Sequence, residues 1–289
     1  MKFRKYLNFI WNKKLVLYQH FNKFLEEVTL AIIAISDLHL GFDDSDKPAF
    51  MRFLGNLQSD PTVTDLVLLG DIVDMWRRDS SGIFLENHDV LDLAILLQKK
   101  MRVHYVAGNH DFHVLKLQGR GYPFNFLKEL TLQQDNVSVK FLHGWEFDDM
   151  QREHFMESLC HSMSDKKGDR DTNIWAALGR YESDLSRFVN FVDRGRKRRM
   201  AEMLQLGPEQ RLVETLKGVE KKACSSVQPG EVLVFGHTHR PFVNREGNLA
   251  NTGSWVTTAP IHNTYVRVEN GKPKLLVFEG AEITERADI

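Results

Sequence analysis

Cysteine is scarce in this chain of 289 residues, which contains only Cys160 and Cys224. Neither belongs to a Cys-x-x-Cys pair, so a disulfide framework and a thiolate metal site are both disfavoured, and a reducing, cytoplasmic location is expected. Long apolar runs are also missing, since the longest candidate, residues 30–35, is far shorter than the roughly 18 residues of a membrane span. Charge of one sign is missing too: the formal net charge is -1. This neutrality argues against nucleic acid as a partner, and any anionic partner must be bound by a local patch.

Residues 1–28 form a distinct first segment, in which apolar residues recur at steps of three, four and seven among basic ones. This spacing predicts an amphipathic helix. Two interpretations are open: the helix packs on the main domain, or it lies in a membrane interface as a peripheral anchor. Lysine and arginine interrupt the apolar residues, which disfavours a cleavable signal peptide.

Short runs rich in β-formers begin at residue 29 and predict a series of strands, most of them buried on both faces. A helical pattern lies between two of the runs, at residues 89–100, and this alternation predicts a layered α/β fold. The last two runs are joined by Asn270-Gly271, a hairpin turn signal. The predicted strands are residues 29–36, 65–69, 103–107, 137–142, 231–235, 249–251, 265–269 and 274–278.

Residues 150–222 interrupt this alternation with a polar, helical pattern that includes a basic stretch at residues 194–199. We interpret them as a helical insertion into a core made of residues 29–149 and 223–289. The basic stretch is interpreted as a solvated face or as a contact for phosphate or anionic lipid.

Polar clusters follow five of the predicted strands. Because ligands bind at the carboxyl ends of strands in open α/β sheets, these clusters are expected to converge on one crevice. Imidazole and carboxylate groups suit divalent Mn, Fe or Zn. Seven such groups gathered without a metal would leave buried polar atoms unpaired, which is costly. The clusters are Asp37-Leu38-His39, Gly70-Asp71-Ile72-Val73-Asp74, Gly108-Asn109-His110-Asp111, His143-Gly144 and Gly236-His237-Thr238-His239.

The order of these motifs, DxH, GDxxD, GNHD, HG and GHTH, resembles the calcineurin-like metallophosphoesterase superfamily. The resemblance implies a four-layer αββα sandwich, here with the helical insertion as a lid, and two divalent metal ions. One ion would be held by Asp37, His39, Asp71 and His239. The other would be held by Asp71, Asn109, His143 and His237, with Asp71 bridging both ions.

The resemblance also implies hydrolysis of a phosphoester or pyrophosphate by metal-activated water. A paired metal site polarises the phosphorus–oxygen bond and stabilises charge on the attacking and leaving oxygens. His110 would stabilise the developing charge or protonate the leaving group. Asp111 would orient His110 or its neighbourhood, or would serve only as a turn residue.

Three further segments are similar to the UDP-2,3-diacylglucosamine hydrolases of lipid A synthesis: residues 70–76, 236–241 and 251–255, together with the insertion. That resemblance implies a nucleotide-linked lipid substrate, release of UMP and an acylated sugar phosphate, and Mn²⁺ as the usual metal, with Fe, Zn or Mg as alternatives. One position departs from that family, because its members typically carry Arg where this chain has His110.

Four residues are candidates for substrate contact: Arg77, Arg78, Arg240 and Trp255. Trp76 and Trp145 could also frame the pocket, although buried aromatic residues are usually core. The alternatives to a lipid-linked substrate are a broad phosphodiesterase or phosphatase acting on small soluble phosphoesters, a nuclease, and a non-catalytic scaffold. The sequence makes no prediction of oligomeric state.

Overall fold

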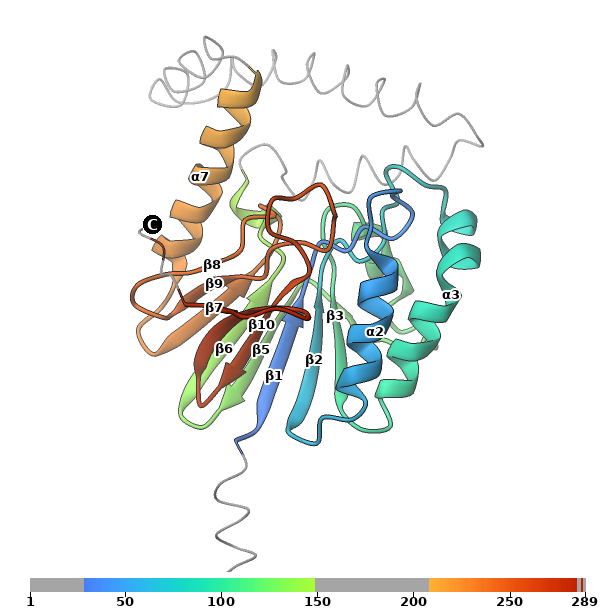
Figure 1. Ribbon diagram of the computed structural model, residues 1–289, viewed down its shortest axis with the longest axis horizontal. Coiled ribbons are helices and arrows are strands. Elements are labelled where there is room, and N and C mark those ends of the chain that lie inside the picture. The colour runs from blue at the N-terminus through green and yellow to red at the C-terminus, as the bar shows by residue number, and fades with distance from the viewer. Residues whose placement is uncertain (1–28, 149–207, 285–286, 288–289) are drawn as a thin grey trace, which may run out of the picture.

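The computed structural model describes residues 29–148, 208–284 and 287. The predicted helix at residues 1–28 and most of the predicted insertion lie outside these residues. Two β-sheets stand at the centre, and helices cover their outer faces (Figure 1). Among the described residues, no helix is both long and apolar enough to cross a membrane.

The first sheet has seven strands in the order β12-β11-β10-β1-β2-β3-β4. Its centre is parallel: β1 pairs with β2, and β2 pairs with β3. The edge beyond β1 is antiparallel. The strands are β1 (Ala31–Ile35), β2 (Val63–Leu69), β3 (Arg102–Val106), β4 (Phe126–Leu127), β10 (Thr264–Glu269), β11 (Lys272–Val277) and β12 (Glu282–Ile283).

The second sheet has five strands in the order β5-β6-β7-β9-β8. Strands β6, β7 and β9 are parallel, and an antiparallel strand closes each edge. The strands are β5 (Glu129–Gln134), β6 (Val137–Leu142), β7 (Glu231–Phe235), β8 (Phe242–Val243) and β9 (Leu249–Asn251).

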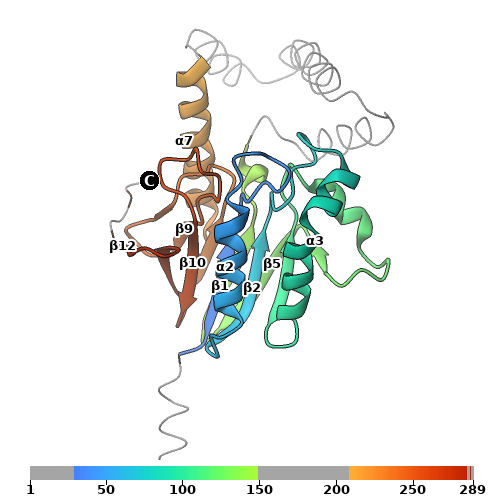
Figure 2. The ribbon, with the colours of Figure 1, turned by 45° about the vertical axis from the view of Figure 1, so that its right-hand side comes forward.

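Separate apolar cores hold the layers together. One fills the space between the sheets and includes Val67, Phe141 and Val234. A second joins the first sheet to α2 (Lys47–Leu57) and α3 (Ser80–Leu97), which lie side by side on its outer face (Figure 2). A third joins the second sheet to α7 (Pro208–Ser226). This arrangement confirms the predicted four-layer αββα sandwich.

Helices α2 and α3 begin at Asp caps. The Asp46 carboxylate accepts a hydrogen bond from the Ala49 amide at 3.1 Å, and Asp79 accepts one from the Gly82 amide at 2.8 Å. Such caps satisfy amide groups that have no partner within the helix. The helix predicted at residues 89–100 is the second half of α3, which is kinked at Asn87.

Eight predicted strands are present with small differences at their ends, and residues 137–142, 231–235 and 249–251 match their strands fully. The predicted hairpin is present as well: Glu269 pairs with Lys272, and Asn270 and Gly271 both have positive φ. Strands β4, β5, β8 and β12 and helix α2 were not predicted. The predicted boundary at residues 222 and 223 falls inside α7, where Val219 and Ala223 both pack on the second sheet. The division into domains remains a prediction.

Candidate metal centre

Loops that follow β1, β2, β3, β6 and β7 meet at one edge of the sandwich and carry the seven predicted metal ligands. Backbone hydrogen bonds tie these loops together. The Asp37 amide donates to the Gly70 carbonyl at 3.0 Å, and the His39 amide donates to the Asp71 carbonyl at 2.9 Å. Across the two sheets, the His237 amide donates to Asp37 Oδ2 at 3.0 Å. The position of each ligand is therefore set by its neighbours as well as by its own strand.

Five of the seven ligands have a left-handed backbone conformation, which non-glycine residues rarely adopt. They are Asp37, His39, Asp71, His237 and His239, with φ between 52° and 68°. Strain of this kind gathers at functional sites because the surrounding structure holds it in place. The sequence motifs do not predict this left-handed conformation, and only the structure shows it.

Glycines allow the loops to pass close to the ligands. A Cβ atom on Gly108 would lie 2.2 Å from Asp71 Oδ1, and one on Gly236 would lie 2.6 Å from Asp37 Oδ2. Both distances are shorter than real contacts of a Cβ atom. These two positions therefore require glycine for lack of space, not for a special φ.

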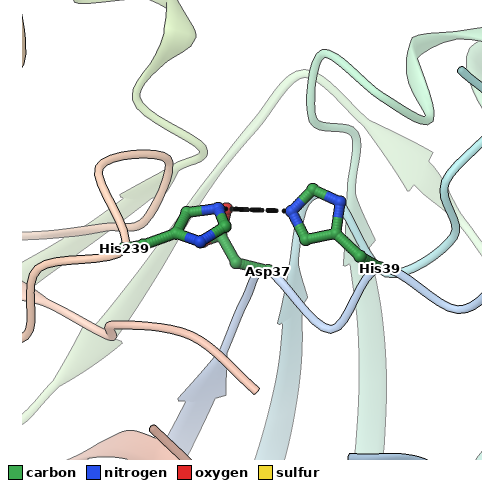
Figure 3. Close-up of side chains that lie close together, drawn as sticks. All are labelled: Asp37, His39 and His239. Atoms are coloured by element: carbon green, nitrogen blue, oxygen red, sulfur yellow. Dashed lines mark hydrogen bonds and ion pairs between the residues drawn. The ribbon is translucent and has the colours of Figure 1, made fainter. Parts of the chain in front are cut away.

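The first group of ligand atoms consists of Asp37, His39 and His239 (Figure 3). The Nε2 atoms of the two histidines lie 3.2 Å apart, although the residues belong to loops of different sheets. Asp37 Oδ1 lies 3.1 Å from His239 Nε2 and 3.8 Å from His39 Nε2. Three potential donor atoms thus surround one point at distances that a single cation can bridge.

A second group of ligand atoms consists of Asp37, Asp71 and His143, and the other two predicted ligands, Asn109 and His237, form a pair beside it, with the His143 and His237 ring centroids 5.4 Å apart. His143 Nε2 lies 3.3 Å from Asp71 Oδ2, and His237 Nδ1 lies 3.1 Å from Asn109 Oδ1. Asp71 also approaches the first group, because its Oδ2 is 3.8 Å from His39 Nε2. Asp71 therefore has the central place that a bridging carboxylate needs.

The chemistry of these atoms fits divalent cations. Within the described part of the chain, Asp37 Oδ1 and His143 Nε2 are buried and make no hydrogen bond, although each faces an oppositely charged group, His239 and Asp71 respectively. Burial alone would raise the pKa of Asp37, but the facing His239 and His143 imidazoles hold it well below its usual range. Burial alone would lower the pKa of His143, but Asp71 and Asp37 raise it to about 10. The carboxylates thus require positive charge close by. Metal ions would provide this charge and would coordinate Asp37 Oδ1 and His143 Nε2.

His110 lies beside the second group and is oriented by Asp74. Its Nδ1 atom is 3.0 Å from Asp74 Oδ1, and its Nε2 atom faces the cluster, 4.0 Å from Asp71 Oδ2. Trp76 stacks on the imidazole, with ring centroids 4.0 Å apart and an interplanar angle of 22°. Asp74 Oδ2 also lies 3.0 Å from His39 Nδ1, so one buried carboxylate orients both histidines.

Asp74 lies within the GDxxD motif, but no role was predicted for it. The second carboxylate of GDxxD, three residues after Asp71, was the available signal. Asp111, by contrast, was predicted to orient His110 or its neighbourhood, and its carboxylate accepts hydrogen bonds from the amides of Ile72 and Gly108 and from the Tyr105 hydroxyl. It therefore links two of the ligand loops, while Asp74 orients the His110 ring.

A second support comes from residues 251–254, behind the ligand loops. Asn251 Nδ2 donates to the Gly236 carbonyl at 2.7 Å, and Ser254 Oγ donates to the Asp37 carbonyl at 3.2 Å. All four residues are buried. The motif at 251–255 was predicted from its resemblance, with Trp255 as a candidate substrate contact, and in the structure Asn251 and Ser254 position the last and first ligand loops.

The residues predicted to contact substrate have different surroundings. Trp255 is fully buried and packs on Phe50 and Phe53, so the prediction of substrate contact is wrong for this residue; its strand-end position hid its core location. Arg77 contacts the Asp74 carboxylate and covers the ring of Phe42.

Arg78 pairs with Glu86, and Arg240 pairs with Glu220 at 3.2 Å. Arg77 and Arg240 remain about half exposed at the edge of the site, whereas Arg78 is less exposed. Their contact with substrate stays a prediction.

Comparison with known proteins identifies a family whose members are similar to this chain. The family model described as calcineurin-like phosphoesterase matches residues 30–241. A UDP-2,3-diacylglucosamine hydrolase from Shewanella baltica is 26% identical over 226 residues, 74% of this chain and 83% of that protein. One from Chromohalobacter salexigens is 27% identical over 274 residues, 86% of this chain and 96% of that protein. A solved phosphoesterase from E. coli has a TM-score of 0.46 at 15% identity, covering 88% of this chain and 97% of its own.

Proposed function

We propose, since this chain belongs to the calcineurin-like phosphoesterase family, that it cleaves the pyrophosphate bond of UDP-2,3-diacylglucosamine at a centre of two Mn²⁺ ions. The chain is a metal-dependent phosphoester hydrolase, and the substrate and the metal are the proposed parts. The substrate is the one named for relatives that match most of the chain. The single observation that carries the two-metal site is the place of Asp71 Oδ2, 3.8 Å from His39 Nε2 and 3.3 Å from His143 Nε2.

Seven residues would hold the ions: Asp37, His39, Asp71 and His239 for one, and Asp71, Asn109, His143 and His237 for the other. Their nitrogen and oxygen atoms suit Mn²⁺, and Fe, Zn or Mg are alternatives. When bound, such a pair activates water and phosphate and neutralises charge on the reacting oxygens.

In this proposal, His110 stabilises the phosphate or donates a proton to the leaving group. Asp74 Oδ1 accepts the Nδ1 proton of the imidazole at 3.0 Å, which leaves Nε2 directed toward the cluster. When the ring also carries a proton on Nε2, the imidazolium can stabilise charge on the phosphate or donate that proton to the departing oxygen. Trp76 covers one face of the ring and limits its rotation. This geometry supports a working role for His110 at the position where the hydrolases typically carry Arg.

The location of the enzyme is part of the same proposal, because a substrate with two acyl chains is expected to lie in a membrane surface. A cytoplasmic enzyme that touches the membrane through residues 1–28 or the basic stretch at 194–199 would reach that substrate. Vesicle sedimentation of the full chain, compared with a chain lacking residues 1–28, would measure this contact.

The first test is UMP release from UDP-2,3-diacylglucosamine by the purified, Mn²⁺-loaded protein. Asp37→Ala and His237→Ala serve as controls, since each removes a ligand of a different ion. Release by the wild type and its loss in both variants is the expected result. Cleavage of bis-p-nitrophenyl phosphate without UMP release would instead favour a broad phosphodiesterase. Retained UMP release in both variants would overturn the proposed centre.

A further inference from the structure

A pocket of about 780 Å³ lies beside the metal centre, between α7 and the loops that follow β7 and β9. Its volume is within the range of pockets that bind small molecules. His239 belongs to both places, because its Nε2 is 3.1 Å from Asp37 Oδ1 and its side chain also lines the pocket. A group attached to a phosphate at the centre can therefore enter this pocket directly.

The pocket contains a buried carboxylate with an unused acceptor. Glu220, on α7, is 4% exposed, and its Oε2 accepts a hydrogen bond from Arg240 Nη1 at 3.2 Å. Its Oε1 is buried and has no hydrogen-bond partner among the described residues. Burial raises the pKa of this carboxyl, and the charge of Arg240 and the nearby Thr238 hydroxyl oppose the rise. An acceptor left unpaired in this way is costly unless a ligand supplies a donor.

The remaining lining divides into an apolar wall and a cationic rim. Pro241, Phe242 and Pro260 form a wall on which a flat ring can pack, and Ile261 stands beside them, 47% exposed. Lys217 and Lys221 lie one helical turn apart on α7 and, with Arg240, place positive charge around the opening. This combination suits a ring with hydroxyl groups carried on a phosphate. A hydrocarbon chain would leave Glu220 unpaired.

We infer that this pocket binds the nucleoside end of a nucleotide substrate, with a ribose or base donor on Glu220 Oε1 and the base against the apolar wall. The inference rests on the proposed function, and it assigns one end of the substrate to a named place. The acyl chains of the substrate then lie elsewhere. Arg240 links the pocket to the metal centre, because it pairs with Glu220 and directly follows His239 in the chain.

The test is calorimetric binding of UMP and of inorganic phosphate to the Mn²⁺-loaded protein and to Glu220→Gln. Replacing a charged acceptor by a neutral one should raise the Kd of UMP about 10-fold, as expected for a hydrogen bond to a charged group. The Kd of phosphate should change less than about twofold, because phosphate does not reach Glu220 in this arrangement. Glu231→Gln, the same change at the far end of β7, is the matched control and should alter neither Kd.

Equal weakening of UMP and phosphate would overturn the inference, since Glu220 would then act only by holding Arg240. Unchanged UMP binding would overturn it as well and would leave the pocket to an acyl chain. Should Glu220→Gln fail to fold, Ile261→Ser on the exposed rim tests the apolar wall. Removing this side chain should raise the Kd of UMP on the order of threefold and leave phosphate unchanged. No change in UMP binding would contradict the assignment.

Activity separates this inference from the proposed function. Glu220→Gln should lower kcat/KM for UDP-2,3-diacylglucosamine about 10-fold and lower that for bis-p-nitrophenyl phosphate by less than about threefold, because the second substrate has no nucleoside and loses only the effect of Glu220 on Arg240. A wild type that binds UMP through Glu220 but does not cleave the lipid would refute the proposed substrate alone. A wild type that cleaves the lipid with UMP affinity independent of Glu220 would refute the pocket assignment alone.

Discussion

The Asp74→Asn substitution probes the centre most sharply, because Asp74 uses both carboxylate oxygens and is fully buried. Oδ1 accepts from His110 Nδ1 and from the amides of Trp76 and Arg77, all at 3.0 or 3.1 Å. Oδ2 faces His39 Nδ1 at 3.0 Å and the Arg77 guanidinium. An asparagine has one acceptor oxygen, whereas the wild-type environment presents donors to both positions.

In the variant, the side-chain oxygen of the asparagine has more donors to satisfy at the Oδ1 position, so the side-chain nitrogen is expected to face His39. A donor at that place forces the proton of His39 from Nδ1 to Nε2, the atom directed toward Asp37 and His239. Loss of such an orienting carboxylate typically costs 10–100-fold in metal affinity. A wrong histidine tautomer in a catalytic site has cost about 10⁴-fold in rate in a serine protease. We therefore expect kcat to fall by at least about 100-fold.

The assay combines metal content by mass spectrometry with hydrolysis of bis-p-nitrophenyl phosphate at saturating Mn²⁺. Asp65→Asn is the matched control, because Asp65 is a buried aspartate at the opposite end of β2, paired with Arg102 and His104. This control should keep wild-type metal content and kcat. If Asp74→Asn also kept both, the orienting role of Asp74 would be refuted.

Three further predictions concern packing and pH. Gly108→Ala should lower the amount of bound metal at least 10-fold, because the new methyl group collides with Asp71. Gly55→Ala, in open space on α2, is the control and should stabilise the fold by up to about 1 kcal/mol. Equal metal content in both variants would contradict the predicted collision. Burial alone would raise the pKa of Asp65, but hydrogen bonds from its partners lower it. The ionised carboxylate therefore stabilises the fold fully above its unfolded pKa of about 3.9, and this stabilisation is lost as the pH falls below that value. In urea titrations, Asp65→Asn should cost about 1–3 kcal/mol at pH 7 and less at pH 3, and a constant difference would count against this assignment. Trp255→Ala should cost about 3–5 kcal/mol in the free energy of unfolding, while Trp255→Phe should leave KM within about twofold; a raised KM in a stable Phe variant would restore a substrate role.

Local sequence was enough to predict all the parallel strands except β4 and to place the candidate ligands at strand ends, for a physical reason. Strands buried on both faces are nearly continuous apolar runs, and each ends where polar residues must begin. The β6 and β7 strands were predicted to the residue because such a change of composition marks both ends. Helix α2 was missed although its buried residues, Ala49, Phe50, Phe53, Leu54 and Leu57, follow helical spacing. That signal was available in the sequence.

Other properties depend on contacts between residues far apart in the chain, and only the tertiary structure decides them. Asp74 follows Asp71 by three residues, yet its partners His39 and His110 lie on two other loops. Trp255 was predicted to contact substrate, but the fold places its side chain in the core against Phe50. Glu220 is one of many acids in a polar segment until α7 packs on the second sheet and buries it beside Arg240. Composition at a strand end is local information, whereas burial and pairing arise only when the sheets and helices close around the site.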